Sequence, residues 1–204
     1  MNPHFIFNAL NSIQEFILLN KSNLASSYLG KFADLMRAYL NQSKTEYITL
    51  KEEVNTLKLY LDVEKIRFEE TLSFTLNVDP EISLDQVEIP PILLQPYVEN
   101  AIKHGLLHKK GERKLDIKFI IKNEQYILCS IMDNGVGRKK SLEINSRRKD
   151  KPNSFATSAA ETRLNLLNAN RKQKIEVDIR DVTKEGVVVG TEVLVSIPRN
   201  HLSN

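Results

Sequence analysis

Residues 90–105 read PPILLQPYVENAIKHG, and this stretch decides which fold the sequence predicts. The proline pair that opens it is typical of a helix start, because the amide of a first-turn residue has no partner within the helix. We therefore predict a helix from about Ile92 to His104. Pro96 is less easily accommodated and can kink this helix or move its start further along the chain. Gly105 is expected to end it, as glycine often does.

Four polar residues of this predicted helix are suited to binding a polyphosphate. Glu99 and Asn100 lie one turn before Lys103 and His104. An asparagine oxygen is a neutral ligand for Mg²⁺, and a lysine ammonium meets a phosphate as a point charge. Glu99 could bind a metal-bound water or receive a proton. We expect Asn100, Lys103 and His104 to bind a nucleotide, Asn100 to ligate the metal, and Glu99 to act in catalysis.

A second motif, Asp-Asn-Gly-Val-Gly, occupies residues 133–137. Asp133 ends an expected strand, so its carboxylate could accept a hydrogen bond from the exocyclic amine of adenine. Gly135 and Gly137 allow positive φ and let the backbone approach a nucleotide closely. By itself, Asp-Asn-Gly is more often a simple turn. Its occurrence together with the Glu99-Asn100 pair favours a nucleotide site.

The segment Asn-Pro-His-Phe-Ile-Phe-Asn-Ala-Leu-Asn, at residues 2–11, contains a third set of candidate residues. Apolar residues at near-helical spacing predict an amphipathic helix over residues 2–20. His4 and Asn8 are four residues apart and share one face. A neutral imidazole nitrogen is nucleophilic near neutral pH, so His4 could accept a phosphoryl group. Asn8 could hold a water or orient the transferred group; a capping or packing role for His4 is the alternative.

Together the three stretches resemble the LytS-like sensor histidine kinases, whose motifs read NPHFxFNxLN, QPxxENAxxHG and DNGxG. The resemblance runs from about Met1 to Pro198. It implies ATP and Mg²⁺ as cofactors, with Asn100 binding Mg²⁺ and Asp133 binding adenine. The implied reaction transfers the γ-phosphoryl group of ATP to His4 and then to an aspartate of a response regulator. In this family the regulator often carries a LytTR-type DNA-binding domain.

One stretch departs from the family pattern. Members commonly carry a second glycine motif, G-x-G-L-x-N, before an Arg-Leu pair, whereas residues 154–164 read SFATSAAETRL. No glycine lies between Gly137 and Gly186. Thr157 and Ser158 could still bind phosphates at a helix start, where free N–H groups favour anions. Two alternatives therefore stay open: a catalytically silent dimeric signalling module of the same fold, and an ATPase without phosphotransfer.

The other segments predict an α+β protein with a helical region at residues 1–68 and an ATP-binding domain at residues 69–204. The following list gives the expected elements: a second helix to about residue 43, a third helix from the Thr49–Glu52 capping box to Phe68, strands at 72–78, 115–121, 126–132, 175–180 and 187–197, a mobile loop at 138–153, and a helix from Thr157 or Ser158 to Asn168. The first two helices predict a hairpin that pairs with a second copy into a four-helix bundle, or packs on the downstream domain. The resemblance implies a Bergerat-type α/β sandwich for the second region.

Composition is ordinary for a soluble globular chain of 204 residues, with 41% hydrophobic and 27% charged residues. No apolar run approaches the roughly 20 residues of a membrane helix, and no signal peptide is recognisable. We expect the cytoplasmic portion of an inner-membrane sensor protein, because the resemblance implies a preceding membrane region. Cys129, the single cysteine, is expected to be a small core residue. A net charge of +3 does not indicate nucleic-acid binding, and we expect DNA contacts from the regulator alone.

Overall fold

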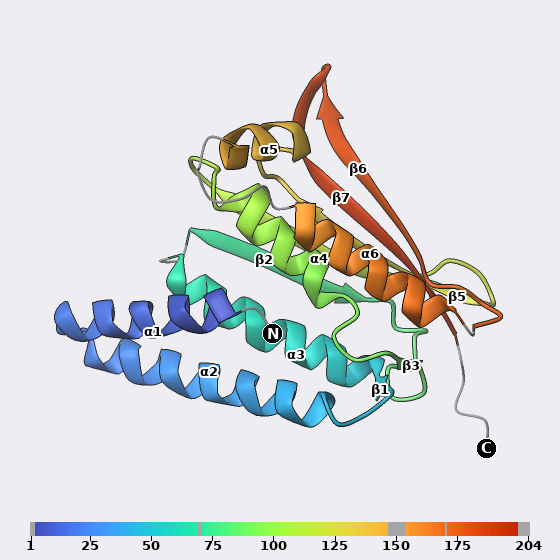
Figure 1. Cartoon of the computed structure of the whole chain (residues 1–204), viewed down its shortest axis with the longest axis horizontal. Coiled ribbons are helices and arrows are strands. Elements are labelled where there is room, and N and C mark those ends of the chain that lie inside the picture. Colours follow the sequence, from blue (N-terminus) through green and yellow to red (C-terminus); the bar gives the residue numbers. More distant parts are fainter. Residues whose placement is uncertain (1–2, 69–70, 147–153, 170, 200–204) are drawn as a thin grey trace.

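The computed structural model describes residues 3–68, 71–146, 154–169 and 171–199. For residues 3, 4, 145, 146 and 154–160 it describes the backbone alone. The elements in chain order are α1 (Pro3–Leu18), α2 (Ser22–Gln42), β1 (Ile48–Thr49), α3 (Leu50–Arg67), β2 (Leu72–Val78), β3 (Glu88–Ile89), α4 (Gln95–Asn100), the π-helical segment η1 (Ala101–Leu106), β4 (Arg113–Ile121), β5 (Tyr126–Asp133), α5 (Arg138–Ser146), α6 (Ser154–Asn168), β6 (Glu176–Lys184) and β7 (Val187–Pro198). Figure 1 shows α1, α2 and α3 stacked together, and α4 and α6 side by side over the sheet.

A five-stranded sheet in the order β2-β4-β5-β7-β6 forms the second half of the fold. β2 and β4 are parallel, and the other neighbours are antiparallel. The parallel pair requires a long crossover, and α4 and η1 lie in that connection. The topology therefore holds α4 and η1 against the sheet.

Alternation along the strands separates a buried face of the sheet from a polar one. The buried face includes Leu115, Ile117 and Phe119 of β4, Ile127, Cys129 and Ile131 of β5, and Val193, Val195 and Ile197 of β7. The opposite face carries ion pairs such as Lys118 with Asp116 and Arg180 with Glu192. A sheet covered by helices on one face is the α+β arrangement that the sequence predicts, and the buried position of Cys129 is confirmed.

The hairpin of α1 and α2 packs on α3. The ring of Phe5 in α1 lies 6.0 Å from the ring of Phe32 in α2 and 5.4 Å from the ring of Tyr60 in α3, measured between centroids. Lys31 of α2 also pairs with Asp62 of α3 at 2.8 Å. This packing uses one face of the hairpin. Large apolar side chains remain exposed elsewhere on it: Phe7, Leu10, Ile17, Leu18, Leu29 and Leu40.

The start of α3 is the capping box that the sequence predicts. The Thr49 side chain accepts a hydrogen bond from the Glu52 amide, and the Glu52 carboxylate accepts one from the Thr49 amide at 2.8 Å. These reciprocal bonds satisfy two amide groups that have no partner within the helix. The short strand β1, which precedes the cap, pairs with β3 through Ile48 and Ile89. The sequence showed no sign of this pairing, because two-residue strands have no periodicity.

Several elements differ from the predicted ones. The helix expected from about Ile92 begins at Gln95, which agrees with the alternative that Pro96 moves its start further along the chain, and it continues beyond Gly105 to Leu106 as η1. Residues 138–146 form α5 where a mobile loop was expected; residues 147–153 lie outside the described part. The last helix starts at Ser154, before the expected Thr157 or Ser158. The sequence of α5 has little apolar periodicity, so this helix could not be predicted. Gly105 is required for close packing against Asp133 and does not end the helix.

Candidate functional site

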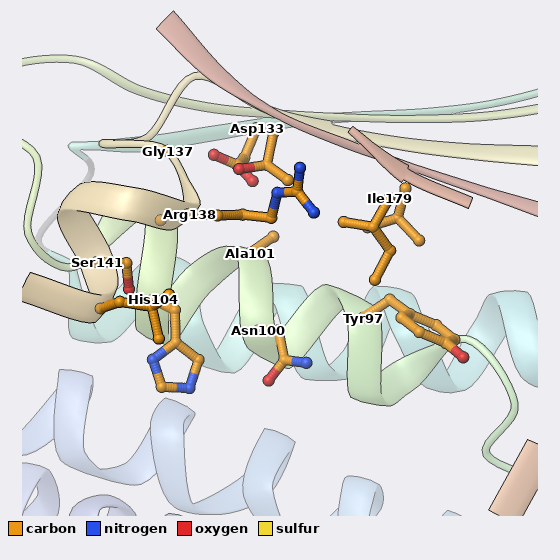
Figure 2. A pocket seen from close by; sticks show the side chains of 13 residues that line it. Tyr97, Asn100, Ala101, His104, Asp133, Gly137, Arg138, Ser141 and Ile179 are labelled. Carbon is orange, nitrogen blue, oxygen red and sulfur yellow. The ribbon is translucent and has the colours of Figure 1, made fainter. Parts of the chain in front are cut away.

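A cavity of ≈ 320 Å³ lies between α4–η1, α5 and the β5–β7–β6 side of the sheet. The predicted residues Asn100, His104, Asp133 and Gly137 line it. Figure 2 shows Asp133 entering from the sheet side and Asn100 and His104 along the helix opposite. The crossover topology thus brings together two motifs, at residues 90–105 and 133–137, that are well separated in the sequence.

Asp133 occupies the end of β5 and is 5% exposed. Its Oδ1 accepts a hydrogen bond from the Gly135 amide at 2.7 Å. Burial raises the pKa of Asp133 to about 6, and the amides of Gly135 and Thr191 offset only part of this effect. A carboxylate so placed is a strong hydrogen-bond acceptor at neutral pH.

Glycines pack against Asp133 from three separate segments. A Cβ added to Gly105 would lie 2.7 Å from Asp133 Oδ1, one on Gly135 would lie 2.4 Å from the Gly105 carbonyl carbon, and one on Gly190 would lie 1.9 Å from the Asp133 carbonyl oxygen. Such distances leave no room for any side chain. Gly105 is therefore required by packing, and the prediction that it ends the helix is wrong.

The two glycines of the second motif have different roles. Gly137 has φ +78°, which confirms the predicted positive φ. Gly135 is not among the residues with positive φ in the described part of the chain, so that part of its prediction is wrong. It is needed instead because the Val136 amide donates to the Gly105 carbonyl oxygen at 3.2 Å, which draws the loop against η1. Gly190 of β7 was missed, since a lone glycine in a strand is not informative.

Glu99 and Lys103 face α2 rather than the cavity. The Lys103 ammonium lies 2.6 Å from Glu99 Oε2, and Gln95 donates to Glu99 Oε1 at 2.9 Å. The same Gln95 amide group bonds the Tyr39 hydroxyl of α2. The sequence placed Glu99 and Lys103 together with Asn100 at one site, whereas the structure separates them onto neighbouring sides of the helix.

The structure describes the side chains of two of the remaining predicted residues, His104 and Asn8. Burial and the charges of Lys103 and His108 lower the pKa of His104, which favours the neutral imidazole at pH 7. Asn8 is half-buried in α1, and its carbonyl accepts a bond from Ser12 at 3.1 Å. His4 lies one turn before Asn8, at the start of α1. The side chains of His4, Thr157 and Ser158 lie outside the described residues.

Several cavity residues were not named as site residues from the sequence, and Arg138 is the charged one among them. Its guanidinium extends over the cavity in Figure 2 and lies 3.3 Å from Asp181 of β6. It opens the basic stretch of residues 138–151, and its place directly after the glycine motif favours a position near a bound polyphosphate. Tyr97 and Ser141 also line the cavity. Their roles depend on which side of α4 and α5 faces the sheet, and short helices do not show this in the sequence.

The cavity suits a planar, amine-bearing base. Asp133 offers a buried acceptor, and the apolar side chains of Ala101, Ile179 and Val193 line the cavity beside it. Within the described residues, His, Cys, Asp and Glu form no group of three that could hold a metal ion. The Asn100 side-chain oxygen could ligate a hard cation that also binds ligand oxygens and waters, which is how Mg²⁺ commonly binds.

Comparisons with known proteins agree with this fold. Residues 1–72 match the family model described as histidine kinase. The sensor histidine kinase/phosphatase LytS of Staphylococcus aureus (strain Mu50 / ATCC 700699) is 34% identical over 140 residues, which are 69% of this chain and 24% of LytS. The chain thus spans 24% of the length of this curated relative.

Solved structures show a similar fold at low sequence identity. The mycobacterial sensor histidine kinase MprB has a TM-score of 0.50 and 12% identity, covering 77% of this chain and 100% of that chain. Full-length ShkA in complex with AMPPNP has a TM-score of 0.52 and 11% identity, covering 84% of this chain and 36% of that chain. In the described part of the present chain, none of the helices has the length and apolarity needed to cross a membrane. The family match and the identity to LytS show that this chain belongs to the histidine kinases.

Proposed function

We propose that this chain is the kinase core of a two-component sensor protein. It binds Mg²⁺-ATP in the cavity, becomes phosphorylated on His4, and passes the phosphoryl group to an aspartate of a response regulator. The observation that carries the proposal is that Asp133, Asn100, Gly105 and Gly137 line one cavity. Residues 1–68 are the phospho-acceptor region in this proposal, and residues 69–204 are the ATP-binding domain.

The proposal gives each predicted site residue a role. Asp133 accepts a hydrogen bond from the adenine amine, and Asn100 offers its side-chain oxygen to the metal. ATP supplies the γ-phosphoryl group when it is bound. Glu99, on the side of the helix that faces the hairpin, receives a proton or orients water near His4, while Lys103 holds its carboxylate. Thr157 and Ser158 bind phosphate at the start of α6.

The partners in this proposal are a second copy of the chain and a receiver domain, with a regulator of the LytTR type as the expected class. The exposed apolar side chains of α1 and α2 support dimer formation, and the name of LytS supports a sensor role. ShkA, with its bound AMPPNP, supports ATP as the nucleotide. We place this chain on the cytoplasmic side of a membrane sensor, with no direct nucleic-acid contact.

A catalytically silent dimeric module is the second candidate. The observation that favours it is the pairing of Lys103 with Glu99, which keeps both groups from phosphate in the described arrangement. The lack of glycine between Gly137 and Gly186 points the same way. An ATPase without phosphotransfer is a third possibility, distinguished by phosphate release that does not depend on His4.

Calorimetric titration with Mg²⁺-ATP is the first test. We expect the wild-type chain to bind, and we expect Asp133→Asn to weaken binding about tenfold or more, because the acceptor for the base amine is lost. Asp116→Asn is the matched control, since Asp116 lies on the polar face of the sheet and pairs with Lys118. A folded wild-type chain that fails to bind at millimolar nucleotide would favour the silent module.

Transfer of labelled phosphate then tests the chemistry. We expect label on the wild-type chain and none on His4→Gln. Equal phosphate release by wild type and His4→Ala, without labelled protein, would identify an ATPase instead. Asn8→Ala should change phosphatase activity on the regulator more than autophosphorylation if Asn8 positions water, and equal loss of both would contradict that role.

A further inference from the structure

Glu53 is a fully buried acid of α3 that the proposed reaction does not use. It is 1% exposed. Its Oε2 accepts a hydrogen bond from the Ile92 amide at 3.0 Å, and its Oε1 accepts one from the Leu94 amide at 2.9 Å. These amides directly precede α4, whose N-cap residue, Leu94, has no side-chain acceptor of its own. A carboxylate from a distant helix therefore caps the helix that lines the cavity.

The backbone held by Glu53 is strained. Ile92 has φ +56°, in the left-handed region that β-branched residues rarely adopt. Such a conformation persists only where surrounding contacts impose it. The hydrogen bond from the Ile92 amide to Glu53 is one of these contacts. A second acts on the preceding residue, because Arg163 of α6 donates to the Pro91 carbonyl oxygen at 2.5 Å.

The surroundings of Glu53 fit a structural anchor. Burial raises the pKa of Glu53 to about 7, and the amides of Leu94, Ile92 and Gln95, with the charge of Arg163, counteract only part of that. Both carboxyl oxygens accept hydrogen bonds from backbone amides, so Glu53 fixes the position of that backbone. Here that geometry is the start of α4.

We infer that Glu53 is a positioning residue for nucleotide binding, which joins α3 to the start of α4 and so orients Asn100 toward the cavity. The inference rests on the proposed ATP site. Tyr97, Asn100 and Ala101 all line the cavity from this one helical segment. A shift at its first turn is carried to all of them, because a helix moves as a rigid element. The same link joins the nucleotide helix to α3, which packs on the hairpin that contains His4.

The test compares Glu53→Gln with Glu64→Gln in the complete chain. A glutamine retains the size of the glutamate but offers one oxygen and one NH₂ group, so one of the two amides loses its acceptor. Glu64 is the matched control because it is equally buried on the same helix, yet it bonds Arg67 and not the loop before α4. Hydrogen exchange of residues 92–100 and the Kd for Mg²⁺-ATP are measured for each protein.

We expect Glu53→Gln to speed amide exchange in residues 92–100 about tenfold and to raise the Kd about fivefold or more. We expect Glu64→Gln to change both by less than about twofold. If Glu53 had only a structural role, both substitutions would lower the thermal midpoint, and the two variants would have the same Kd and the same local exchange rates. Unchanged exchange in Glu53→Gln, or equal effects of the two substitutions, would overturn the inference.

A rescue experiment addresses the strain at Ile92. Glycine adopts positive φ without a steric cost, so Ile92→Gly in the Glu53→Gln background should recover part of the lost affinity and slow the exchange again. Further loss in the double variant would contradict the assignment. If the wild-type chain binds no ATP, the proposed function fails, while the exchange measurement still decides the role of Glu53.

Discussion

The raised pKa of Asp133 makes the stability of the free protein depend on pH. Burial raises this pKa from the ordinary 3.8 to about 6. An acid whose pKa is raised by folding contributes stability below about pH 3.8, and this contribution is lost as the pH rises through about 6. At neutral pH the ionised Asp133 therefore lowers the stability of the free protein, which is the cost of keeping an acceptor ready for a ligand.

We accordingly predict that Asp133→Asn is at least as stable as wild type at pH 8, although it binds nucleotide poorly. The stability difference should shrink or reverse at pH 5, where wild-type Asp133 is protonated. Thermal midpoints at both pH values, measured without nucleotide, check the prediction. The sign would be contradicted if the thermal midpoint of Asp133→Asn minus that of wild type were lower at pH 8 than at pH 5.

Gly135 provides a second prediction at the residue scale. Because a Cβ there would lie 2.4 Å from the Gly105 backbone, Gly135→Ala should destabilise the fold by about 2 kcal/mol. Gly30→Ala is the control: Gly30 lies within α2, and a Cβ there would meet no heavy atom of the described residues within 4 Å. It should stabilise by about 0.5–1 kcal/mol. Urea denaturation distinguishes the two, and similar values would refute the packing argument.

At the scale of elements, α4 with η1 serves two neighbours. Gln95, Glu99 and Lys103 form a polar row toward the hairpin, while Asn100 and His104 face the cavity. The helix is thus positioned from both sides, and the start of α4 depends on Glu53 of α3. This arrangement explains why α3, which contributes nothing to the cavity wall, matters for the shape of the site.

The capping box of α3 allows a direct test at this scale. Thr49→Ala removes the hydroxyl that accepts the Glu52 amide, and we expect a loss of about 1 kcal/mol in the free energy of unfolding. Thr49→Ser keeps a hydroxyl and should cost only a few tenths of that. Urea denaturation of the two variants provides the comparison. An equal loss in both would show that the methyl group, and not the cap, is responsible.

At the scale of the whole molecule, the hairpin packs on α3 and still exposes an apolar stripe. Leu10 is 51% exposed and Ile17 is 60% exposed, on the same face of α1 as Phe7. The hairpin also contacts the downstream region, where Gln95 of α4 bonds the Tyr39 hydroxyl of α2. The proposed pairing with a second copy, which the sequence left as an alternative, would use the other face of the hairpin. The proposed dimer needs no rearrangement of the packing on α3.

We predict that Leu10→Asp combined with Ile17→Asp shifts the chain to the monomer, because charges in an apolar interface are costly. Leu166→Asp is the control, since Leu166 of α6 is 73% exposed outside the hairpin. Sedimentation over a concentration series measures the result. If wild type is a monomer at every concentration, or if the control dissociates equally, the stripe is not the dimer surface.

Much of the fold could be read from the sequence because its signals are local. Helical spacing predicted α1, α2 and α3, the Thr49–Glu52 box located the start of α3, and alternation predicted the strands of the main sheet. Asp133, Asn100, His104 and Gly137 were also predicted, and they line one cavity. These predictions rest on periodicity and on side-chain chemistry, which are properties of residues that lie close together in the sequence.

The sequence by itself therefore determined the α+β class, most elements and the residues suited to a nucleotide. Only the tertiary structure decided that Glu99 and Lys103 face the hairpin, that Gly105 and Gly190 make room for Asp133, and that Glu53 holds the start of α4. The physical reason is the same in each case. These roles arise where segments far apart in the chain come into contact, and the fit between two surfaces leaves no periodic signal in either one.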